Sequence, residues 1–144
     1  MIKAPPDIKV TVWIRLMRAQ TKALSAIEAD LKSASLPVLA WYDVLLELRR
    51  AADIGLRPFE LESRLLLAQH NVSRLLDRME AKGLIERKAF EGDGRGLRIV
   101  ISKAGRDLQK HIAPIYQSAL EKFFSSKLNE AEATKLAELL ALLD

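Results

Sequence analysis

The sequence contains no cysteine among its 144 residues. This absence excludes disulfide bonds, thiolate metal sites and regulation by thiol oxidation, and it fits a cytoplasmic protein. Histidine is almost as scarce, because only His70 and His111 are present and they fall in separate predicted elements. A structural zinc site is therefore not expected, and no other metal or cofactor is predicted.

Long apolar runs are also missing. No stretch approaches the roughly 18 apolar residues that a transmembrane helix needs. The opening residues MIKAPPDIKV lack the apolar segment and the small-residue cleavage site of a signal peptide. We therefore expect a cytoplasmic protein without a membrane partner. Hydrophobic residues still make up 49% of the chain, so one domain over residues 1–144 can bury a core.

Glycine is sparse, yet three of the six glycines fall within EGDGRG at residues 91–96. A phosphate-binding glycine loop needs a helix N-terminus after it, whereas here LRIVI follows and alternates like a strand. A calcium loop needs several regularly spaced oxygen ligands, which Asp93 alone does not supply. The stretch is predicted to be a hairpin tip between the strands LIERK and LRIVI.

The rest of the chain is predicted to be mostly helical. Apolar residues at helical spacing indicate helices over about 8–31, 37–52 and 69–82, a short helix from 58, and helices starting near 102 and 130. Pro37 suits the first turn of its helix, Gly83 the end of the fourth, and Ser102 the cap of the fifth. The short helix and the helix over 69–82 form a helix-turn-helix, which the hairpin extends to a winged helix. The expected fold is mostly α with a small hairpin: a winged-helix lobe over about 37–101, with dimerisation helices over about 8–33 and 102–144.

Positive charge is concentrated in the centre of the chain. Residues 63–106 hold ten Lys and Arg against five Asp and Glu, whereas the rest holds thirteen against fourteen. This imbalance predicts a polyanionic partner for the central part, a solvated basic surface being the alternative. Early residues of a recognition helix approach base edges, where Asn or Gln suits adenine and Arg suits guanine. An arginine at the hairpin tip suits a narrow minor groove. The candidate DNA contacts are Ser63, Arg64, Gln69, His70, Asn71, Ser73, Arg74, Arg78 and Arg95.

Three residues of the same helix have the types of a hydrolytic triad: His70, Ser73 and Asp77. A working triad needs a nucleophile on a strained turn with oxyanion donors around it, and this segment supplies neither. We therefore expect no catalysis. Asp77 faces a polyanion poorly, so it is expected to pair with an arginine.

The stretch from Leu36 to Leu108 resembles the MarR (multiple antibiotic resistance regulator) family of winged-helix transcription factors. LPVLAWYDVLLEL resembles the second helix of the family, and ELESRLLLAQHNVSRLLDRMEAKGLIER resembles its helix-turn-helix and first wing strand. DGRG matches the D-x-R-G wing motif, and ISKAG matches the entry to the fifth helix. The resemblance implies a sequence-specific regulator of double-stranded DNA, in which Arg95 is the minor-groove arginine and Asp93 supports the wing by pairing with a nearby arginine.

The resemblance also implies an intertwined homodimer built from the terminal helices, whose apolar residues exceed what the lobe can cover. Such a dimer would bind a pseudo-palindromic operator, act as a repressor and be released by a small aromatic or anionic ligand. Two alternatives stay open: a winged-helix protein-interaction module without DNA binding, and a small-molecule binding protein or enzyme that uses an interhelical pocket. The candidate ligand contacts are Trp13, Arg15, Arg18, Trp41, Tyr42 and His111.

Overall fold

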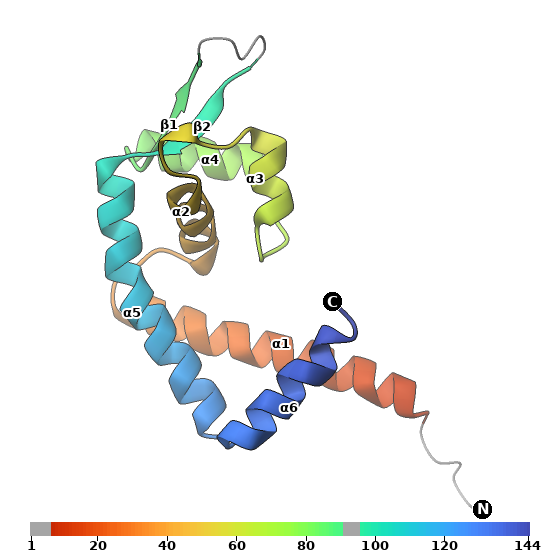
Figure 1. The fold of residues 1–144 in the computed structure, drawn as a ribbon. Helices are drawn as coiled ribbons and strands as arrows, with labels where there is room; N and C mark the ends of the chain where they lie inside the picture. Colours follow the sequence, from red (N-terminus) through yellow and green to blue (C-terminus); the bar gives the residue numbers. More distant parts are fainter. Residues whose placement is uncertain (1–6, 91–95) are drawn as a thin grey trace, which may run out of the picture. The chain divides into compact units, whose positions relative to one another are not determined.

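The computed structural model describes residues 7–90 and 96–144, and its fold is mostly α with one hairpin, as predicted. Asp93 and Arg95 lie outside the described residues. The elements follow in the order α1 (Ile8–Ser33), α2 (Leu39–Ala51), the 3-10 turn η1 (Ala52–Ile54), α3 (Pro58–Arg64), α4 (Val72–Ala81), β1 (Ile85–Lys88), β2 (Arg98–Ile101), α5 (Lys103–Ser125) and α6 (Glu130–Ala141) (Figure 1).

The chain divides into two compact units. Leu31–Ile115 form one unit, called the lobe here, and Met1–Asp30 with Tyr116–Asp144 form the second, called the terminal unit. The lobe extends past the expected limits of 37–101 on both sides, because it includes the end of α1 and the first half of α5.

The lobe has an apolar core to which α2, α3, α4, β1 and β2 contribute. Its fully buried side chains include Leu45 and Leu48 of α2, Leu61 of α3, and Met79 of α4. The predicted apolar stripe of α4 is confirmed, since Val72, Leu75, Leu76 and Met79 are all buried. Such a stripe at helical spacing fixes which face of α4 points inward and which face remains for solvent or a partner.

The hairpin pairs β1 with β2 in antiparallel register, from Ile85 opposite Ile101 to Lys88 opposite Arg98. Leu56 adds a short bridge to Ile99 on the free edge of β2, which the sequence did not predict. Gly55 makes this approach possible, because it has a φ of 69° and an added Cβ would lie 2.5 Å from the Ile99 carbonyl oxygen.

Two helix starts differ from the sequence prediction. Pro37 lies before α2, whose N-cap is Val38, so it is not in the first turn. The helix expected from Gln69 begins instead at Val72, because Asn71 is its N-cap. The other end agrees with the prediction: Gly83 has a φ of 74°. The Leu84 amide there donates to the Met79 carbonyl, which closes α4 as a Schellman motif.

Ser102 caps α5 as predicted, because its Oγ accepts a hydrogen bond from the Gly105 amide at 3.0 Å. In the sixth helix, Asn129 and Glu132 form a reciprocal capping box. These local signals explain why both helices begin where the sequence indicates.

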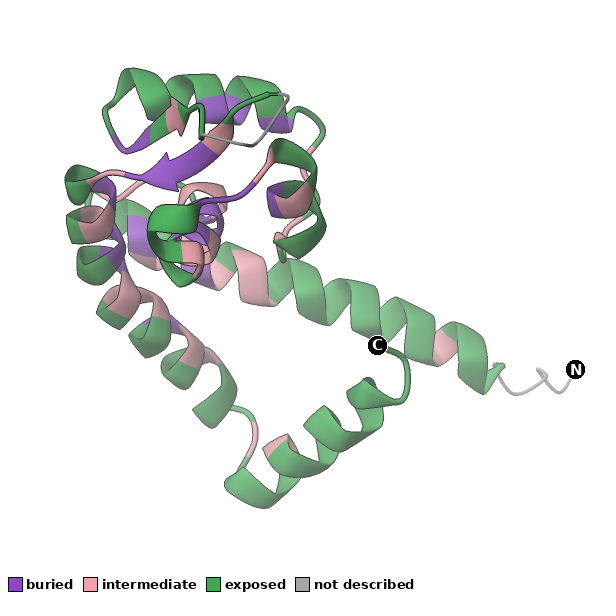
Figure 2. Cartoon of the chain, turned by 45° about the horizontal axis from the view of Figure 1, so that its top comes forward, coloured by how far each residue is buried: buried purple, intermediate pink, exposed green. Residues whose placement is uncertain are grey.

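The terminal unit leaves most of its apolar side chains exposed. The first part of α1 and nearly all of α6 are exposed (Figure 2). Trp13 is 61% exposed and Leu139 is 49% exposed. Of the apolar side chains of the amphipathic helix α1, only Ile27 and Leu31 near its C-terminal end are buried within the single chain.

Candidate nucleic-acid interface

The outer face of α4 presents polar and cationic side chains to solvent. Ser73, Arg74 and Arg78 are exposed there, opposite the buried stripe. In the part of the chain that the structure describes, no hydrogen bond or ion pair engages the guanidinium of Arg74 or Arg78. Both are therefore available to accept a base edge or a phosphate as partner.

The other early candidates lie in the turn before α4. Gln69 is half-buried and His70 is exposed, and neither is helical. Asn71 accepts a hydrogen bond from the Arg74 amide through Oδ1 at 2.9 Å, which is the N-cap of the helix. A bidentate contact from Asn71 to adenine would therefore have to share or replace this cap, whereas its amide nitrogen is available as a donor.

The two candidates of α3 lie at its C-terminal end. Ser63 is exposed, and its Oγ donates to the Glu60 carbonyl one turn earlier at 2.8 Å. Arg64 is the last residue of α3 and is exposed just before the turn. These positions leave both side chains on the outer surface of the helix-turn-helix.

A buried carboxylate holds the turn between α3 and α4. Asp43 of α2 is only 8% exposed. Its Oδ1 accepts from the Leu66 amide at 3.1 Å and its Oδ2 from the Leu67 amide at 2.8 Å. Two charge-assisted hydrogen bonds to consecutive backbone amides fix the course of the turn, and so the position at which α4 starts.

Arg87 of β1 joins the wing to α4. Its side chain is half-buried, and its guanidinium donates to Asp77 Oδ1 at 2.9 Å and to Glu80 Oε1 at 2.8 Å. The backbone amide of Arg87 donates to the second oxygen of Glu80 at 3.2 Å. The expected pairing of Asp77 with an arginine is confirmed. The same contacts compensate two negative charges on the helix that carries Arg74 and Arg78.

The two wing candidates, Asp93 and Arg95, remain sequence predictions because they lie outside the described residues. The hairpin that leads to them is described as far as Phe90 on one side and from Gly96 on the other. The Arg98 guanidinium lies 5.9 Å from the centre of the Phe90 ring, where a cation and an aromatic face attract each other. This contact ties the two sides of the hairpin together above its last ladder pair.

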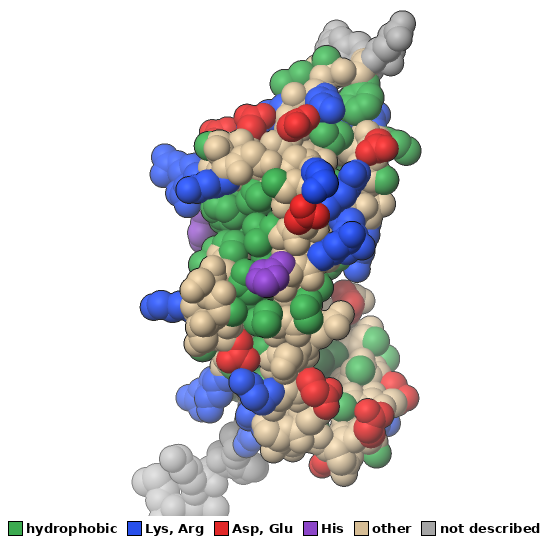
Figure 3. Space-filling view, turned by 90° about the vertical axis from the view of Figure 1, so that its left-hand side faces the viewer, with side chains coloured by type: hydrophobic (Ala, Val, Ile, Leu, Met, Phe, Trp, Pro, Cys, Tyr) green, Lys and Arg blue, Asp and Glu red, His purple; other side chains and the backbone are tan. Residues whose placement is uncertain are grey.

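Charged side chains of both signs share the surface of the chain. Figure 3 shows one face of the chain. On this face, Lys and Arg side chains lie among Asp, Glu and apolar side chains and do not form one continuous basic patch. Compensated pairs such as Arg87 with Asp77 and Glu80 leave other cations of the segment to interact with a partner.

The residues that resemble a hydrolytic triad do not form one. Asp77 is engaged by Arg87, and His70 precedes the helix that carries Ser73. Among residues 7–90 and 96–144, no group of three His, Cys, Asp or Glu could hold a metal ion. None of the helices described is both long enough and apolar enough to cross a membrane.

The candidate ligand residues fall into both units. Tyr42 is buried in the lobe, and Trp41 packs against the lobe core. His111 is exposed on α5. In the terminal unit, Arg15 and Arg18 line a groove of about 610 Å³, but Trp13 does not.

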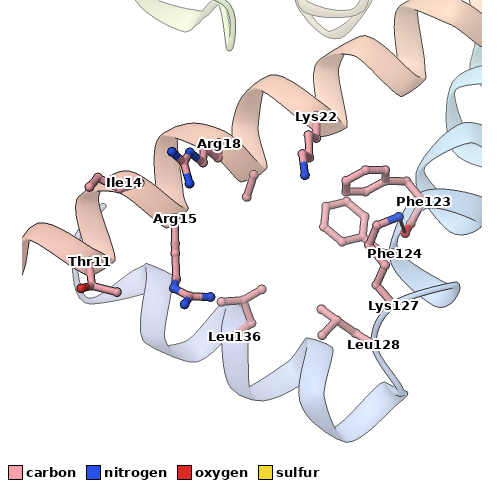
Figure 4. Close-up of a pocket in the computed structure, with 11 residues that line it drawn as sticks. Thr11, Ile14, Arg15, Arg18, Lys22, Phe123, Phe124, Lys127, Leu128 and Leu136 are labelled. Atoms are coloured by element: carbon pink, nitrogen blue, oxygen red, sulfur yellow. Dashed lines mark hydrogen bonds between the residues drawn. The ribbon is translucent and has the colours of Figure 1, made fainter. Parts of the chain in front are cut away.

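This groove lies between α1, the end of α5, and α6. Figure 4 shows Arg15 extending from α1 toward α6, and the rings of Phe123 and Phe124 beside Lys127 at the α5 end. The two rings meet edge to face with centroids 5.1 Å apart. The remaining lining residues are Thr11, Ile14, Ala19, Lys22, Leu128 and Leu136.

Two residues that the sequence did not predict, Asp43 and Arg87, position the exposed face of α4. Asp43 interrupts the apolar run of α2, and a lone carboxylate among buried positions is a usable signal of a buried hydrogen-bond acceptor. Arg87 occupies an ordinary polar position of an alternating strand. Its role depends on partners seven and ten residues earlier, which the alternation does not reveal.

Comparison with known proteins identifies the family. Residues 35–96 match the MarR family. An uncharacterised HTH-type transcriptional regulator of Bacillus cereus ATCC 10987 is 30% identical over 129 residues, which cover 90% of this chain and 84% of the relative. The transcriptional repressor MprA of Escherichia coli K12 is 24% identical over 123 residues, or 85% of this chain and 69% of the relative.

A solved structure of Bordetella bronchiseptica BpsR, whose DNA binding is regulated by 6-hydroxynicotinic acid, superimposes with a TM-score of 0.81. The identity is 20%, and the match covers 99% of this chain and all of the other, so this likeness concerns the fold. The helix-turn-helix with its exposed α4, the hairpin and the relatives all indicate the same family. The chain belongs to the MarR family and is a DNA-binding transcriptional regulator.

Proposed function

We propose that this regulator is a homodimeric repressor that reads a pseudo-palindromic operator and is released by a small ligand. The observation that carries the proposal is the exposed face of α4, where Arg74 and Arg78 have no partner within the described residues. A helix of this kind, backed by a closed core, can enter the major groove without unfolding any part of the lobe.

The DNA contacts fall into three classes by position. Gln69, His70, Asn71, Ser73 and Arg74 lie at or near the start of α4, where base edges are read. Ser63 and Arg64 suit phosphates, which supply affinity and register, and Arg78 suits a base or a phosphate. Arg95 inserts in the adjacent minor groove, and Asp93 supports the wing.

The dimer is supported by the apolar surface of the terminal unit. Exposed apolar side chains include Trp13 and Met17 of α1, Leu139 of α6, and Leu143 just beyond the end of α6. An apolar surface of this extent in a small protein marks an interaction site. A two-fold dimer places two copies of α4 about one DNA turn apart, which matches an operator with two half-sites.

The ligand is an aromatic or anionic small molecule by analogy with the acid that regulates BpsR. It would favour a dimer in which the two reading helices are wrongly spaced for the operator. Repression is supported by MprA, which is a transcriptional repressor. We further propose that residues 1–144 act as one domain without catalytic activity, and that they work in the cytoplasm, where a transcriptional regulator meets its DNA.

The test is fluorescence-anisotropy binding to a labelled duplex from upstream of the protein's own coding sequence, with a scrambled duplex as control. We expect tight binding to the upstream duplex and a steep loss of affinity with salt, because phosphate contacts release counterions. Equal affinity for both duplexes would contradict sequence-specific reading of this operator. Absence of binding to either duplex at low salt would contradict the assigned DNA contacts and favour a protein-interaction module.

A further inference from the structure

The turn between α3 and α4 carries one exposed leucine. Leu66 is 77% exposed. Among residues 60–89, all of which the structure describes, Leu66 is the only large apolar side chain that is exposed. Its two neighbours, Leu65 and Leu67, are half-buried. Of the three consecutive leucines, only Leu66 therefore places its side chain mostly in solvent.

The backbone that carries Leu66 is fixed from within the lobe. The Leu66 amide donates to Asp43 Oδ1 at 3.1 Å, and the Leu67 amide donates to Asp43 Oδ2 at 2.8 Å. Binding to a mobile loop costs the conformational entropy that is lost when the loop becomes ordered. Because the buried Asp43 already holds these two amides, a partner that contacts Leu66 does not have to order this part of the turn.

Leu66 lies between candidate DNA contacts. Arg64 is two residues earlier and His70 is four residues later, and both are exposed. A partner of Leu66 therefore has to fit beside the bound DNA. A protein partner would need about 800 Å² of surface on this side, which a single leucine among polar residues does not offer. The base edges of the major groove include one apolar group, the C5-methyl group of thymine.

We infer that Leu66 reads a thymine of the operator by packing against its C5-methyl group. This inference rests on the proposed reading of the operator by α4, and it adds an apolar contact to the polar ones assigned there. A leucine makes no side-chain hydrogen bond, so it favours thymine over cytosine, which lacks the methyl group and presents an amino group instead.

The test replaces each thymine of the operator, one at a time, by deoxyuridine. This change removes the C5-methyl group and leaves the base pairing intact. Fluorescence anisotropy then gives the affinity of the wild type and of Leu66→Ala for each duplex. At one position in each half-site, the wild type should lose about fourfold in affinity, the equivalent of one buried methyl group. Leu66→Ala should bind the thymine and deoxyuridine duplexes of that position equally well.

Ile54→Ala is the matched control. Ile54 is a 69% exposed apolar residue of the same lobe, but it lies in η1 and outside the helix-turn-helix. This variant should show the same deoxyuridine profile as the wild type. Leu66→Ala should also keep the wild-type free energy of unfolding in urea, because Asp43 holds the backbone amide of residue 66 and not its side chain.

The outcomes separate the leucine contact from the reading of the operator. If every deoxyuridine duplex weakens Leu66→Ala as much as it weakens the wild type, the methyl contact is overturned while operator binding stands. A Leu66→Ala variant that loses the same affinity for all duplexes, the scrambled one included, also overturns it, because Leu66 then acts without regard to sequence. Equal affinity of the wild type for the operator and the scrambled duplex would instead overturn the operator reading on which the inference rests.

Discussion

The lobe and the terminal unit both contain amphipathic helices, yet they differ in how much of the apolar surface they bury. In the lobe, α2, α3, α4 and the hairpin enclose a core whose largest side chains are fully buried. In the terminal unit, most large apolar side chains of α1 and α6 stay exposed. The lobe therefore buries its apolar side chains through contacts within the chain, whereas the terminal unit leaves its apolar surface to the second copy of the proposed dimer.

This difference suits a DNA-binding dimer. A reading surface has to keep its shape when it is free and when it is bound, so it benefits from a core that closes on itself. In the proposed dimer, the terminal helices would set the spacing of the two recognition helices. The proposed ligand would change that spacing through the terminal helices.

The largest expected effect comes from the lobe core. Leu48→Ala removes a fully buried side chain of α2, and such a cavity lowers the free energy of unfolding by about 2–5 kcal/mol. Leu139→Ala on α6 removes a side chain that is half exposed in the single chain, so its main effect should be weaker self-association. Urea unfolding followed by circular dichroism measures the first, and sedimentation velocity measures the second.

The proposed difference between the lobe and the terminal unit would be contradicted if Leu48→Ala and Leu139→Ala had the same effects on unfolding free energy and on self-association. In native buffer, Leu48→Ala should sediment like the wild type, whereas Leu139→Ala should dissociate at a higher concentration. A Leu139→Ala variant that dimerises normally but loses as much unfolding free energy as Leu48→Ala would show that α6 is packed within its own chain.

The next largest expected effect is the loss of operator affinity when a candidate DNA-contacting arginine is removed. Arg74→Ala should weaken operator binding by roughly 1–3 kcal/mol and relax specificity at one base pair, because a bidentate base contact is lost. Arg95→Ala should cost a similar roughly 1–3 kcal/mol through the minor groove. Arg74 is exposed on α4, outside the lobe core and the terminal unit, so Arg74→Ala should remain a dimer, and the same result is expected for Arg95→Ala.

Anisotropy titrations on the operator and on a scrambled duplex separate these roles. Arg64→Ala serves as the control, since loss of a phosphate contact should weaken binding to both duplexes alike and reduce the salt slope by about one. An operator affinity for Arg95→Ala equal to that of the wild type at matched salt would remove Arg95 from the mechanism.

The sequence predicted the parts of this structure that depend on local pattern. The stripe Val72–Leu75–Leu76–Met79, the turn at Gly83 and the cap at Ser102 each follow from residues within one or two helical turns. The start of α4 was placed three residues early because Gln69 and His70 continue a helical pattern that the cap at Asn71 ends.

Contacts between residues that lie far apart in the sequence could not be predicted from local patterns. Asp43 meets the turn amides 23 and 24 residues later. The stripe of α1 was correctly recognised as amphipathic, yet periodicity alone does not say which molecule covers it. The predicted DNA and ligand contacts stay predictions for the same reason: their partners are outside the chain.

The smallest expected effect tests how the wing is joined to the reading helix. Arg87→Ala frees Asp77 and Glu80 on the helix that approaches DNA. Because both carboxylates are largely exposed, the loss of unfolding free energy should stay at about 0.2–1 kcal/mol. Operator affinity should fall by a comparable roughly 1 kcal/mol, about fivefold, since two uncompensated negative charges then face the phosphates.

Lys88→Ala is the matched control, because it removes one positive charge from the same strand but leaves Asp77 and Glu80 paired. If both variants lose the same operator affinity, Arg87 contributes only net charge. If Arg87→Ala loses more, and Asp77→Asn/Glu80→Gln in the same chain recovers part of the loss, the unpaired carboxylates are the cause. Any loss of operator affinity that remains beyond that of Lys88→Ala is then assigned to the position of the hairpin relative to α4, which Arg87 helps to fix.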